Sequence, residues 1–230
     1  MDILNTKKGR IFPSLIAADL LNLQREIQVL DPYVDGYHID IMDGHFVPNL
    51  TWGSMFIDAI CSVTAKPLWV HLMVDNPLWW IEILKMPDDT LVSFHIESTK
   101  GVDLCVKSIK EKKWTPSLAV SPKTPISETF PFFNILDHVL VMSVEPGFSG
   151  QSFISHVQQK INPVLDAFCK RVSSNKTGEN WGTIAFDGGI NAENIGDLFT
   201  QGVTDFAIAN AIFASRDICG AVMHLRELIV

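Results

Sequence analysis

The sequence predicts a single-domain α/β protein, a (β/α)₈ (TIM) barrel, and two observations carry this prediction. Short apolar runs alternate with longer amphipathic stretches along all 230 residues. Several of the runs are almost continuously apolar, as is typical of strands buried on both faces of a parallel sheet. Eight such strand-then-helix units fit the small end of the size range of this barrel. A doubly wound open sheet is the alternative on pattern alone.

The expected strands follow one another without a break in composition. They cover residues 11–16, 36–41, 67–72, 91–95, 117–120, 138–142, 182–186 and 206–209. We expect the barrel domain to span residues 11–230, with residues 1–10 as a loosely held arm. The polar segment 173–180 is expected to form a surface loop.

Amphipathic patterns between the strands predict helices. One covers residues 19–30, with Leu20, Leu23, Ile27 and Leu30 on one face. A second covers residues 152–170 and begins at Ser152. A third covers residues 191–201 and ends before Gly202, which is a common residue after a helix.

Composition and charge restrict the class of partner. Hydrophobic residues make up 47% of the chain and charged residues 19%, as is usual for a soluble globular protein. The net charge of −8 and the pI near 5.3 argue against a nucleic acid or an anionic membrane as partner. An anionic substrate would then need a local site, such as oriented backbone amides.

The cysteines and the start of the chain predict a cytoplasmic protein. The four cysteines form no CxxC pair, which favours free thiols in a reducing compartment over a zinc cluster or a disulfide framework. The first residues show no apolar stretch of signal-peptide length, and no run of about 18 apolar residues occurs in the sequence.

Polar residues lie near the carboxyl ends of several expected strands, where the active site of such a barrel is found. His38 and Asp40 are two apart and therefore share a face of their strand. His71 and Asp187 end two other strands, so these four side chains are expected to meet. Two imidazoles and two carboxylates suit a divalent ion such as Zn²⁺, Fe²⁺, Mn²⁺ or Co²⁺. Each residue taken singly is more often a structural polar group.

Small residues follow the last three strands. They lie in the segments 146–151, 187–189 and 209–211, two of which contain glycines. Glycines let backbone N–H groups approach an anion closely, and barrels of this kind often bind phosphate after strands seven and eight. The pattern favours a phosphate site, although most such turns are only turns.

Two long motifs resemble the ribulose-phosphate 3-epimerase family. They are HIDIMDGHFVPN at residues 38–49 and VMSVEPGFSGQSF at residues 141–153. Shorter matches are PSLIAAD at 13–19, HLMV at 71–74, FHIE at 94–97, PKTP at 122–125 and FDGGIN at 186–191. The matches run in the family's order over nearly the whole chain.

The resemblance implies a role for each matched position. His38, Asp40, His71 and Asp187 would bind one divalent metal ion per subunit, and Asp40 and Asp187 would also be the acid/base pair. The implied substrate contacts are His71, Ser14 near the metal, a cap of Met42, Met73 and Met142, and a phosphate site at Gly147, Phe148, Ser149, Gly150, Gly188, Gly189, Ala209 and Asn210. His95 and Glu97 match a motif without an assigned role.

The implied reaction inverts C3 of a ketose phosphate, with D-ribulose 5-phosphate as the leading substrate, by two-base proton transfer through a cis-enediolate. Metal bound to the sugar oxygens would stabilise the developing charge. D-Allulose-6-phosphate 3-epimerase is a rival within the family, and a non-catalytic sugar-phosphate binder or a lysine-dependent aldolase or decarboxylase are rivals of other classes. The family also suggests a homo-oligomer.

Three positions depart from the family's usual pattern. Ser149 replaces a glycine, Ser121 replaces an asparagine, and Ala209-Asn210 replaces a Gly-Ser pair. Backbone amides survive all three changes, but a Cβ at Ser149 or Ala209 is expected to narrow the pocket or to strain the turn. The departures therefore bear on which sugar phosphate fits the pocket more than on the type of reaction.

Overall fold

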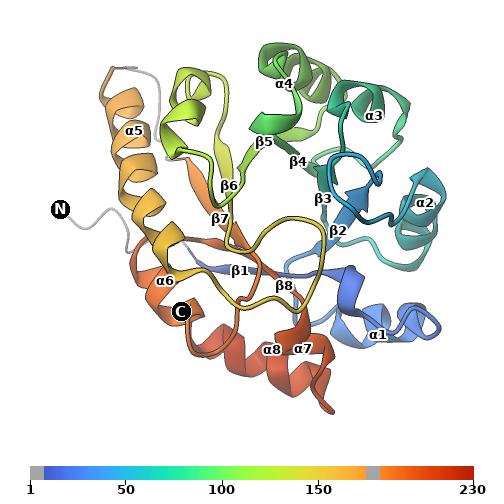
Figure 1. Ribbon diagram of the computed structural model, residues 1–230. Helices are drawn as coiled ribbons and strands as arrows, with labels where there is room; N and C mark the ends of the chain where they lie inside the picture. Colours follow the sequence, from blue (N-terminus) through green and yellow to red (C-terminus); the bar gives the residue numbers. More distant parts are fainter. Residues whose placement is uncertain (1–7, 175–181) are drawn as a thin grey trace.

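A computed structural model of the protein describes residues 8–174 and 182–230. Its eight strands are β1 (Arg10–Pro13), β2 (Tyr37–Met42), β3 (Leu68–Met73), β4 (Leu91–His95), β5 (Thr115–Val120), β6 (His138–Met142), β7 (Thr183–Asp187) and β8 (Asp205–Ile208). They form one sheet in the order β1-β8-β7-β6-β5-β4-β3-β2, and each neighbouring pair is parallel. The sheet curls round with the helices outside it (Figure 1).

Contacts between β1 and β2 close the barrel almost completely. Ser14, directly after β1, makes a parallel bridge with His38 of β2. Below it, the backbone N–H of Ile11 donates to the Asp35 carboxylate at 2.8 Å, and the Asp35 N–H donates to the carbonyl of Ile11 at 3.1 Å. The predicted (β/α)₈ barrel is thereby confirmed.

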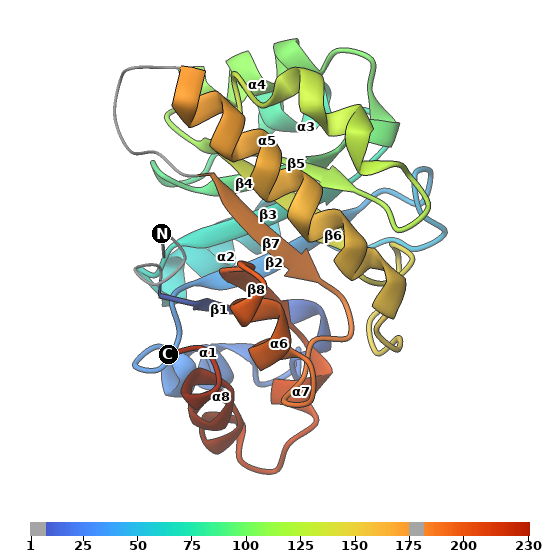
Figure 2. The ribbon, with the colours of Figure 1, turned by 90° about the vertical axis from the view of Figure 1, so that its left-hand side faces the viewer.

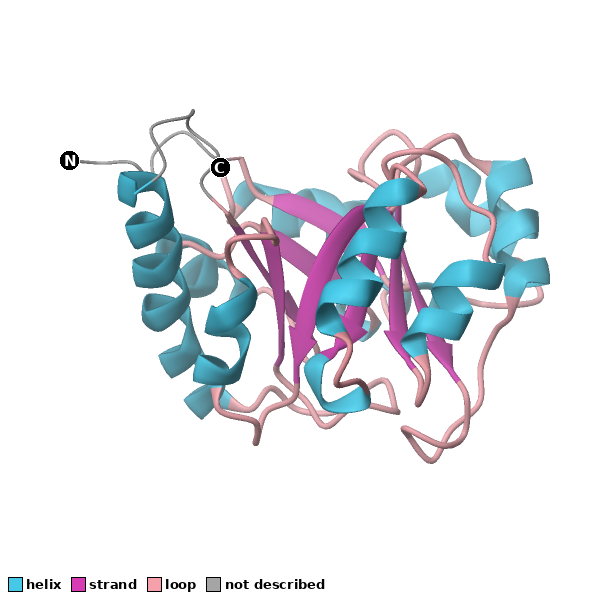
Figure 3. Ribbon diagram, turned by 90° about the horizontal axis from the view of Figure 1, so that it is seen from above, coloured by secondary structure: helices cyan, strands magenta, loops and turns pink. Residues whose placement is uncertain are grey.

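Helices cover the outside of the strands. They are α1 (Leu23–Leu30), α2 (Ser54–Val63), α3 (Pro77–Ile83), α4 (Val102–Glu111), α5 (Ile161–Ser174), α6 (Ile195–Thr200), α7 (Asn210–Phe213) and α8 (Ile218–Glu227). Short 3₁₀ helices are η2 (Leu15–Ala17), η3 (Ile96–Ser98), η4 (Ile126–Phe132) and η5 (Ser155–Lys160). Figure 2 shows the long α5 in front of the strands, and Figure 3 shows the strands enclosed by helices. None of the helices within the described ranges is long and apolar enough to cross a membrane.

Helix starts differ more from expectation than strand bounds do. The first helix begins at Leu23 rather than at residue 19, because the Asp19 carboxylate accepts from Leu21 N–H and the Asn22 side chain and forms a turn. Leu20 is therefore 49% exposed instead of facing the core. The helix expected from residue 191 begins at Ile195, after a turn in which Asn191 N–H donates to the Asn194 side chain at 3.0 Å.

The expected helix over residues 152–170 is divided into η5 and α5, and α5 continues to Ser174. The loop expected over 173–180 is thus wrong for its first two positions, and its remaining residues lie outside the described ranges. Residues 1–7 of the expected N-terminal arm also lie outside them.

The barrel interior has an apolar middle layer between two polar ends. Side chains of the middle layer are Phe12, Trp69, Leu91, Ala119, Leu140, Ala185 and Ala207. The Trp69 ring meets His38 edge-on at 4.7 Å between centroids and His138 at 5.6 Å. Because β2 and β6 carry these histidines toward opposite ends of the barrel, Trp69 separates two polar layers.

Asp205 is the centre of the polar layer at the amino ends of the strands. Its carboxylate accepts from Arg10 Nε at 2.8 Å and from Arg10 Nη2, and it lies 3.1 Å from His138 Nε2. Burial alone would raise the pKa of Asp205, but the hydrogen bonds from His138 and Arg10 outweigh burial and lower the pKa. The carboxylate therefore stays charged inside the barrel.

We expect Asp205→Ala to lower the free energy of unfolding by about 2–3 kcal/mol, because it leaves buried His138 without its charged partner. The cost is below that of a wholly buried ion pair, since Arg10 is half exposed and can turn to water. Denaturant titration with Asp88→Ala as a control measures this. Asp88 pairs with Lys113 in full solvent, so its loss should leave the midpoint nearly unchanged. Equal midpoints for the two variants would contradict the assignment.

Candidate active site

Four side chains meet at the carboxyl ends of the strands. One ligand atom from each of His38, Asp40, His71 and Asp187 lies within 4.8 Å of the others. His38 and Asp40 both face inward from β2, and His71 stands beside Asp40 in the β2–β3 register. Asp187 ends β7. The structure thus brings together the four residues that the sequence placed around one point.

Both histidines of this cluster present a nitrogen without a hydrogen-bond partner. His38 Nε2 and His71 Nδ1 are buried and unpaired among the described residues. His71 Nδ1 lies 3.3 Å from Asp40 Oδ1 and 3.3 Å from Asp187 Oδ2, and His38 Nε2 lies 3.9 Å from the latter oxygen. Buried imidazole nitrogens facing carboxylate oxygens form a donor set that fits a divalent transition-metal ion.

The other nitrogen of each histidine is already engaged. His38 Nδ1 lies 3.2 Å from Ser14 Oγ, which donates to Asp40 Oδ2 at 2.7 Å. His71 Nε2 lies 3.0 Å from Nε2 of His95. Because these outer contacts fix both rings, the free nitrogens are held toward the centre of the cluster.

Asp40 and His71 keep their charges although both side chains are buried. Burial alone would raise the pKa of Asp40, but His38 and His71 hold it well below its usual range. Burial disfavours the imidazolium of His71, yet the carboxylates of Asp187 and Asp40 outweigh burial and raise its pKa to about 9. The proton and a metal ion would therefore compete for the same atom, His71 Nδ1.

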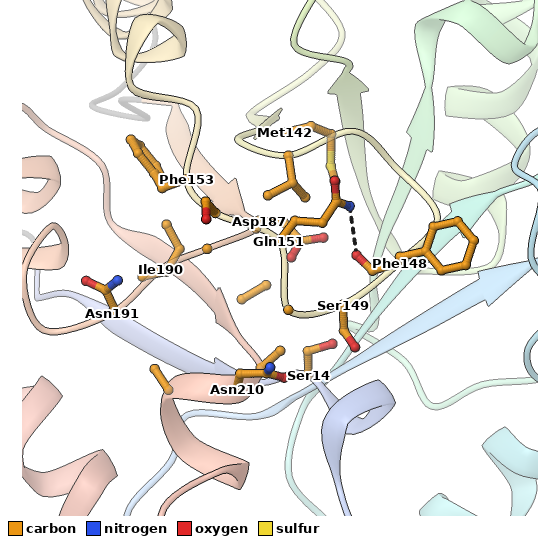
Figure 4. Close-up of a pocket in the computed structure, with 18 of the residues that line it drawn as sticks. Ser14, Met142, Phe148, Ser149, Gln151, Phe153, Asp187, Ile190, Asn191 and Asn210 are labelled. Carbon is orange, nitrogen blue, oxygen red and sulfur yellow. Dashed lines mark hydrogen bonds between the residues drawn. The ribbon is translucent and has the colours of Figure 1, made fainter.

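A pocket of about 780 Å³ opens above the cluster. It is lined by the predicted residues Ser14, Asp40, Met42, Met73, Met142, Gly147, Phe148, Ser149, Gly150, Asp187, Gly188, Gly189, Ala209 and Asn210. Figure 4 shows several of them around the opening. His38 and His71 lie below the pocket, fully buried.

Methionines form the apolar part of the pocket wall. Met42 and Met73 pack with Val47 in a small buried cluster, and Met142 joins the middle layer of the barrel. All three are about 2% exposed and line the pocket. The three methionine side chains therefore place apolar groups beside the carboxylates.

Close backbone packing explains two of the glycines beside the pocket. Gly189 has φ +64°, and a Cβ there would lie 2.5 Å from the backbone nitrogen of Phe153. At Gly188 a Cβ would lie 2.4 Å from Val144. Larger residues at either position would push the turn after β7 away from the loop after β6.

Neither Ser149 nor Ala209, which depart from the family's pattern, has a left-handed backbone. Among the described residues, positive φ outside glycine occurs only at Asp89 and Lys113, so Ser149 adopts an ordinary backbone conformation. Ala209 has φ −99° and ψ −99°. Neither position therefore needs the left-handed backbone that glycine favours, and both side chains line the pocket that they were expected to narrow. The Asn210 side chain instead fills space, with Nδ2 2.9 Å from the point that a Cβ on Gly150 would occupy.

Two side chains that hold the loop after β6 were not assigned from the sequence. Asn49 Nδ2 donates to the carbonyl of Gly147 at 2.8 Å. Gln151 Nε2 donates to the carbonyls of Glu145 at 2.6 Å and Phe148 at 2.9 Å, the latter drawn dashed in Figure 4. Both residues lie in the two long motifs, which were the available signal.

Comparisons with known proteins agree with these motifs. A model of the ribulose-phosphate 3-epimerase family matches residues 10–213. The chain is 37% identical to a ribulose-phosphate 3-epimerase of Mycobacterium tuberculosis, over 94% of this chain and 91% of that protein. It is 34% identical to the enzyme of the same name from Bacillus subtilis, over 94% and 98% respectively.

A crystal structure of 3-hexulose-6-phosphate synthase is similar in fold. Its TM-score is 0.64 at 16% identity, covering 96% of this chain and 100% of that one. At this identity the likeness concerns the barrel only.

Because a proton and a metal ion compete for His71 Nδ1, we expect the metal affinity to depend on pH. Below about pH 9 His71 is protonated, so each bound ion must displace a proton and the affinity must fall as the pH falls. We expect Co²⁺ affinity to rise by about tenfold per unit between roughly pH 6 and pH 8. Competition with a chelator measures it, and His71→Gln should flatten the slope. A flat profile for the unaltered protein would contradict this assignment.

Proposed function

The chain belongs to the ribulose-phosphate 3-epimerase family, and we propose that it interconverts D-ribulose 5-phosphate and D-xylulose 5-phosphate with one divalent metal ion per subunit. The family match makes the protein an enzyme, an isomerase that epimerises a sugar phosphate. The observation that carries the finer proposal is the pair of carboxylates, Asp40 and Asp187, which reach one point beside two unpaired imidazole nitrogens.

Asp40 and Asp187 would move the proton at C3. They come from β2 and β7, which are separated in the barrel by β1 and β8, so they approach the centre from different directions. One carboxylate removes the proton from one face of the sugar, and the other returns a proton to the opposite face. The roles exchange in the reverse reaction.

The remaining residues would bind and isolate the sugar. His38, Asp40, His71 and Asp187 would hold a divalent ion, which would supply Lewis-acid chemistry to the carbonyl next to C3. Met42, Met73 and Met142 keep water from the reacting carbons. The phosphate would lie at the backbone amides of the segments 147–150, 188–189 and 209–210, which border the same pocket.

Rival functions find less support. A lysine-dependent aldolase or decarboxylase would need a lysine at the reacting centre, and within the described residues none lines the pocket. A non-catalytic sugar-phosphate binder would not need two opposed carboxylates. D-Allulose-6-phosphate 3-epimerase shares the reaction and differs in the length of the sugar.

We also propose a cytoplasmic homo-oligomer. Several large apolar side chains are well exposed, among them Leu21 at 94%, Met55 at 84% and Leu50 at 73%. Covering them with a second copy would remove apolar surface from water.

An assay with both sugars tests the reaction and the substrate. We expect turnover of D-ribulose 5-phosphate to stop after treatment with a chelator and to return with a divalent ion, because the carbonyl is polarised only when the ion is bound. D-Allulose 6-phosphate should react more slowly. A preference for the hexose would replace the proposed substrate, and no turnover of either sugar by metal-loaded protein would overturn the proposal.

Exchange of the C3 proton with deuterated solvent tests which carboxylate acts on which face of the sugar. We expect Asp40→Asn and Asp187→Asn each to lower kcat by about 10²- to 10⁴-fold, with Asp58→Asn on the exposed face of α2 as a control. Each variant retains one base, so each should exchange the C3 proton of one epimer only, and the two variants should differ in which epimer. Exchange of both epimers by a single variant would show that one residue serves both faces.

A further inference from the structure

The outer nitrogen of His71 meets a second histidine instead of water. His71 Nε2 and His95 Nε2 lie 3.0 Å apart, both rings are fully buried, and their planes differ by 22°. Two imidazole nitrogens at this distance share one proton, so one donates and the other accepts. The direction of this hydrogen bond decides which nitrogen of His71 keeps a lone pair for the site.

Glu97 determines that direction. Its Oε1 accepts from Ser121 N–H at 2.8 Å, and its Oε2 lies 3.1 Å from His95 Nδ1. A carboxylate can only accept, and it lies closer to Nδ1 than the Ser121 hydroxyl does at 3.4 Å, so His95 carries its proton on Nδ1 and offers the lone pair of Nε2. His71 must then donate its Nε2–H, so that the neutral ring has its lone pair on Nδ1, the atom that faces Asp40 and Asp187.

The outer end of this chain is fixed to the scaffold. Glu97 lies in η3 after β4, and Ser121 directly follows β5. Lys160 Nζ donates to the carbonyls of Ser121 at 2.7 Å and Thr124 at 2.8 Å, which holds the loop that binds the carboxylate. The Phe46 ring covers His95 at 4.8 Å between centroids. Glu97 therefore has little freedom to turn away into solvent.

We propose that His95 and Glu97 are positioning residues, whose hydrogen-bonded relay to His71 fixes the tautomer that binds metal through Nδ1 and strengthens that nitrogen as a ligand. The inference rests on the divalent-ion site proposed above. An acceptor on the outer nitrogen of a ligating histidine orients the ring and raises its basicity. Here the carboxylate acts through a second imidazole, whereas Nδ1 of His38 lies 3.2 Å from both the Ser14 hydroxyl and the Asp40 carboxylate.

The tautomers themselves can be observed in the zinc-loaded protein. ¹⁵N–¹H correlation spectra of the imidazoles should show His95 protonated on Nδ1 and His71 protonated on Nε2, with His95→Gln used to assign the His95 signals. Protonation of His95 on Nε2 would overturn the relay, whatever the activity of the protein.

Metal affinity measures the strength of the relay. Replacing the carboxylate in Glu97→Gln should weaken Zn²⁺ binding by about 10- to 100-fold in competition with a chelator. Glu145→Gln is the matched control, because it removes the same charge at the mouth of the barrel, where Glu145 pairs with Lys123 and touches no histidine. An equal loss in both variants would assign the effect to overall charge and overturn the relay.

A pair of changes at His95 separates positioning from packing. His95→Gln keeps an oxygen that can accept the His71 Nε2–H, so it should retain more Zn²⁺ affinity than His95→Leu, by about tenfold. Equal affinities would overturn the relay. If the unaltered protein binds no divalent ion, the proposed metal-dependent function fails together with the relay. If it binds Zn²⁺ and Glu97→Gln binds it equally well, only the relay fails.

Discussion

The balance of charge at the mouth of the barrel is the constraint on which the site depends. Two carboxylates approach one point at the floor of the pocket, where their like charges repel each other at short range. His71 Nδ1 stands 3.3 Å from an oxygen of each, so the positive charge between them is either a proton on that atom or a bound cation. Ser14 and His95 aim the two imidazoles at this point, and the alternation of side chains along β2 delivers His38 and Asp40 to it from a single strand.

The same barrel holds a second set of charges, and the apolar layer keeps the two apart. Asp205 and His138 lie at the amino ends of the strands, whereas Asp40 and His71 lie at the carboxyl ends. Trp69 stands between them, with its indole N–H donating to Ser93 at 2.7 Å and its faces and edges against His38 and His138. The Arg10–Asp205 ion pair and the cluster of the proposed active site can therefore occupy one interior without sharing protons.

The barrel and the four clustered residues were predictable, because the alternation of side chains along the strands and the family motifs both indicate them. Helix starts were not, since the carboxylate of Asp19 and the amide of Asn194 compete with the helix for backbone N–H groups in ways that hydrophobic pattern does not show. The contact between His95 and His71 was hidden for another reason. It joins side chains of neighbouring strands, and its existence depends on register and on the turn that carries Glu97. The glycine pattern could not show whether Ser149 and Ala209 stand at left-handed positions, because backbone angles decide it, and neither has a positive φ.

Because the first strand pairs with the last, the site can be completed only late in biosynthesis. His38, Asp40 and His71 leave the ribosome early, whereas Asp187 follows more than a hundred residues later. β1 gains its partner β8 only when almost the whole chain has been made, and Ser14, which orients His38, lies directly after β1. A nascent chain thus carries three of the four clustered residues on a sheet that is still open. The finished cluster exists only after the first strand has paired with the last, so maturation of the centre is tied to completion of translation.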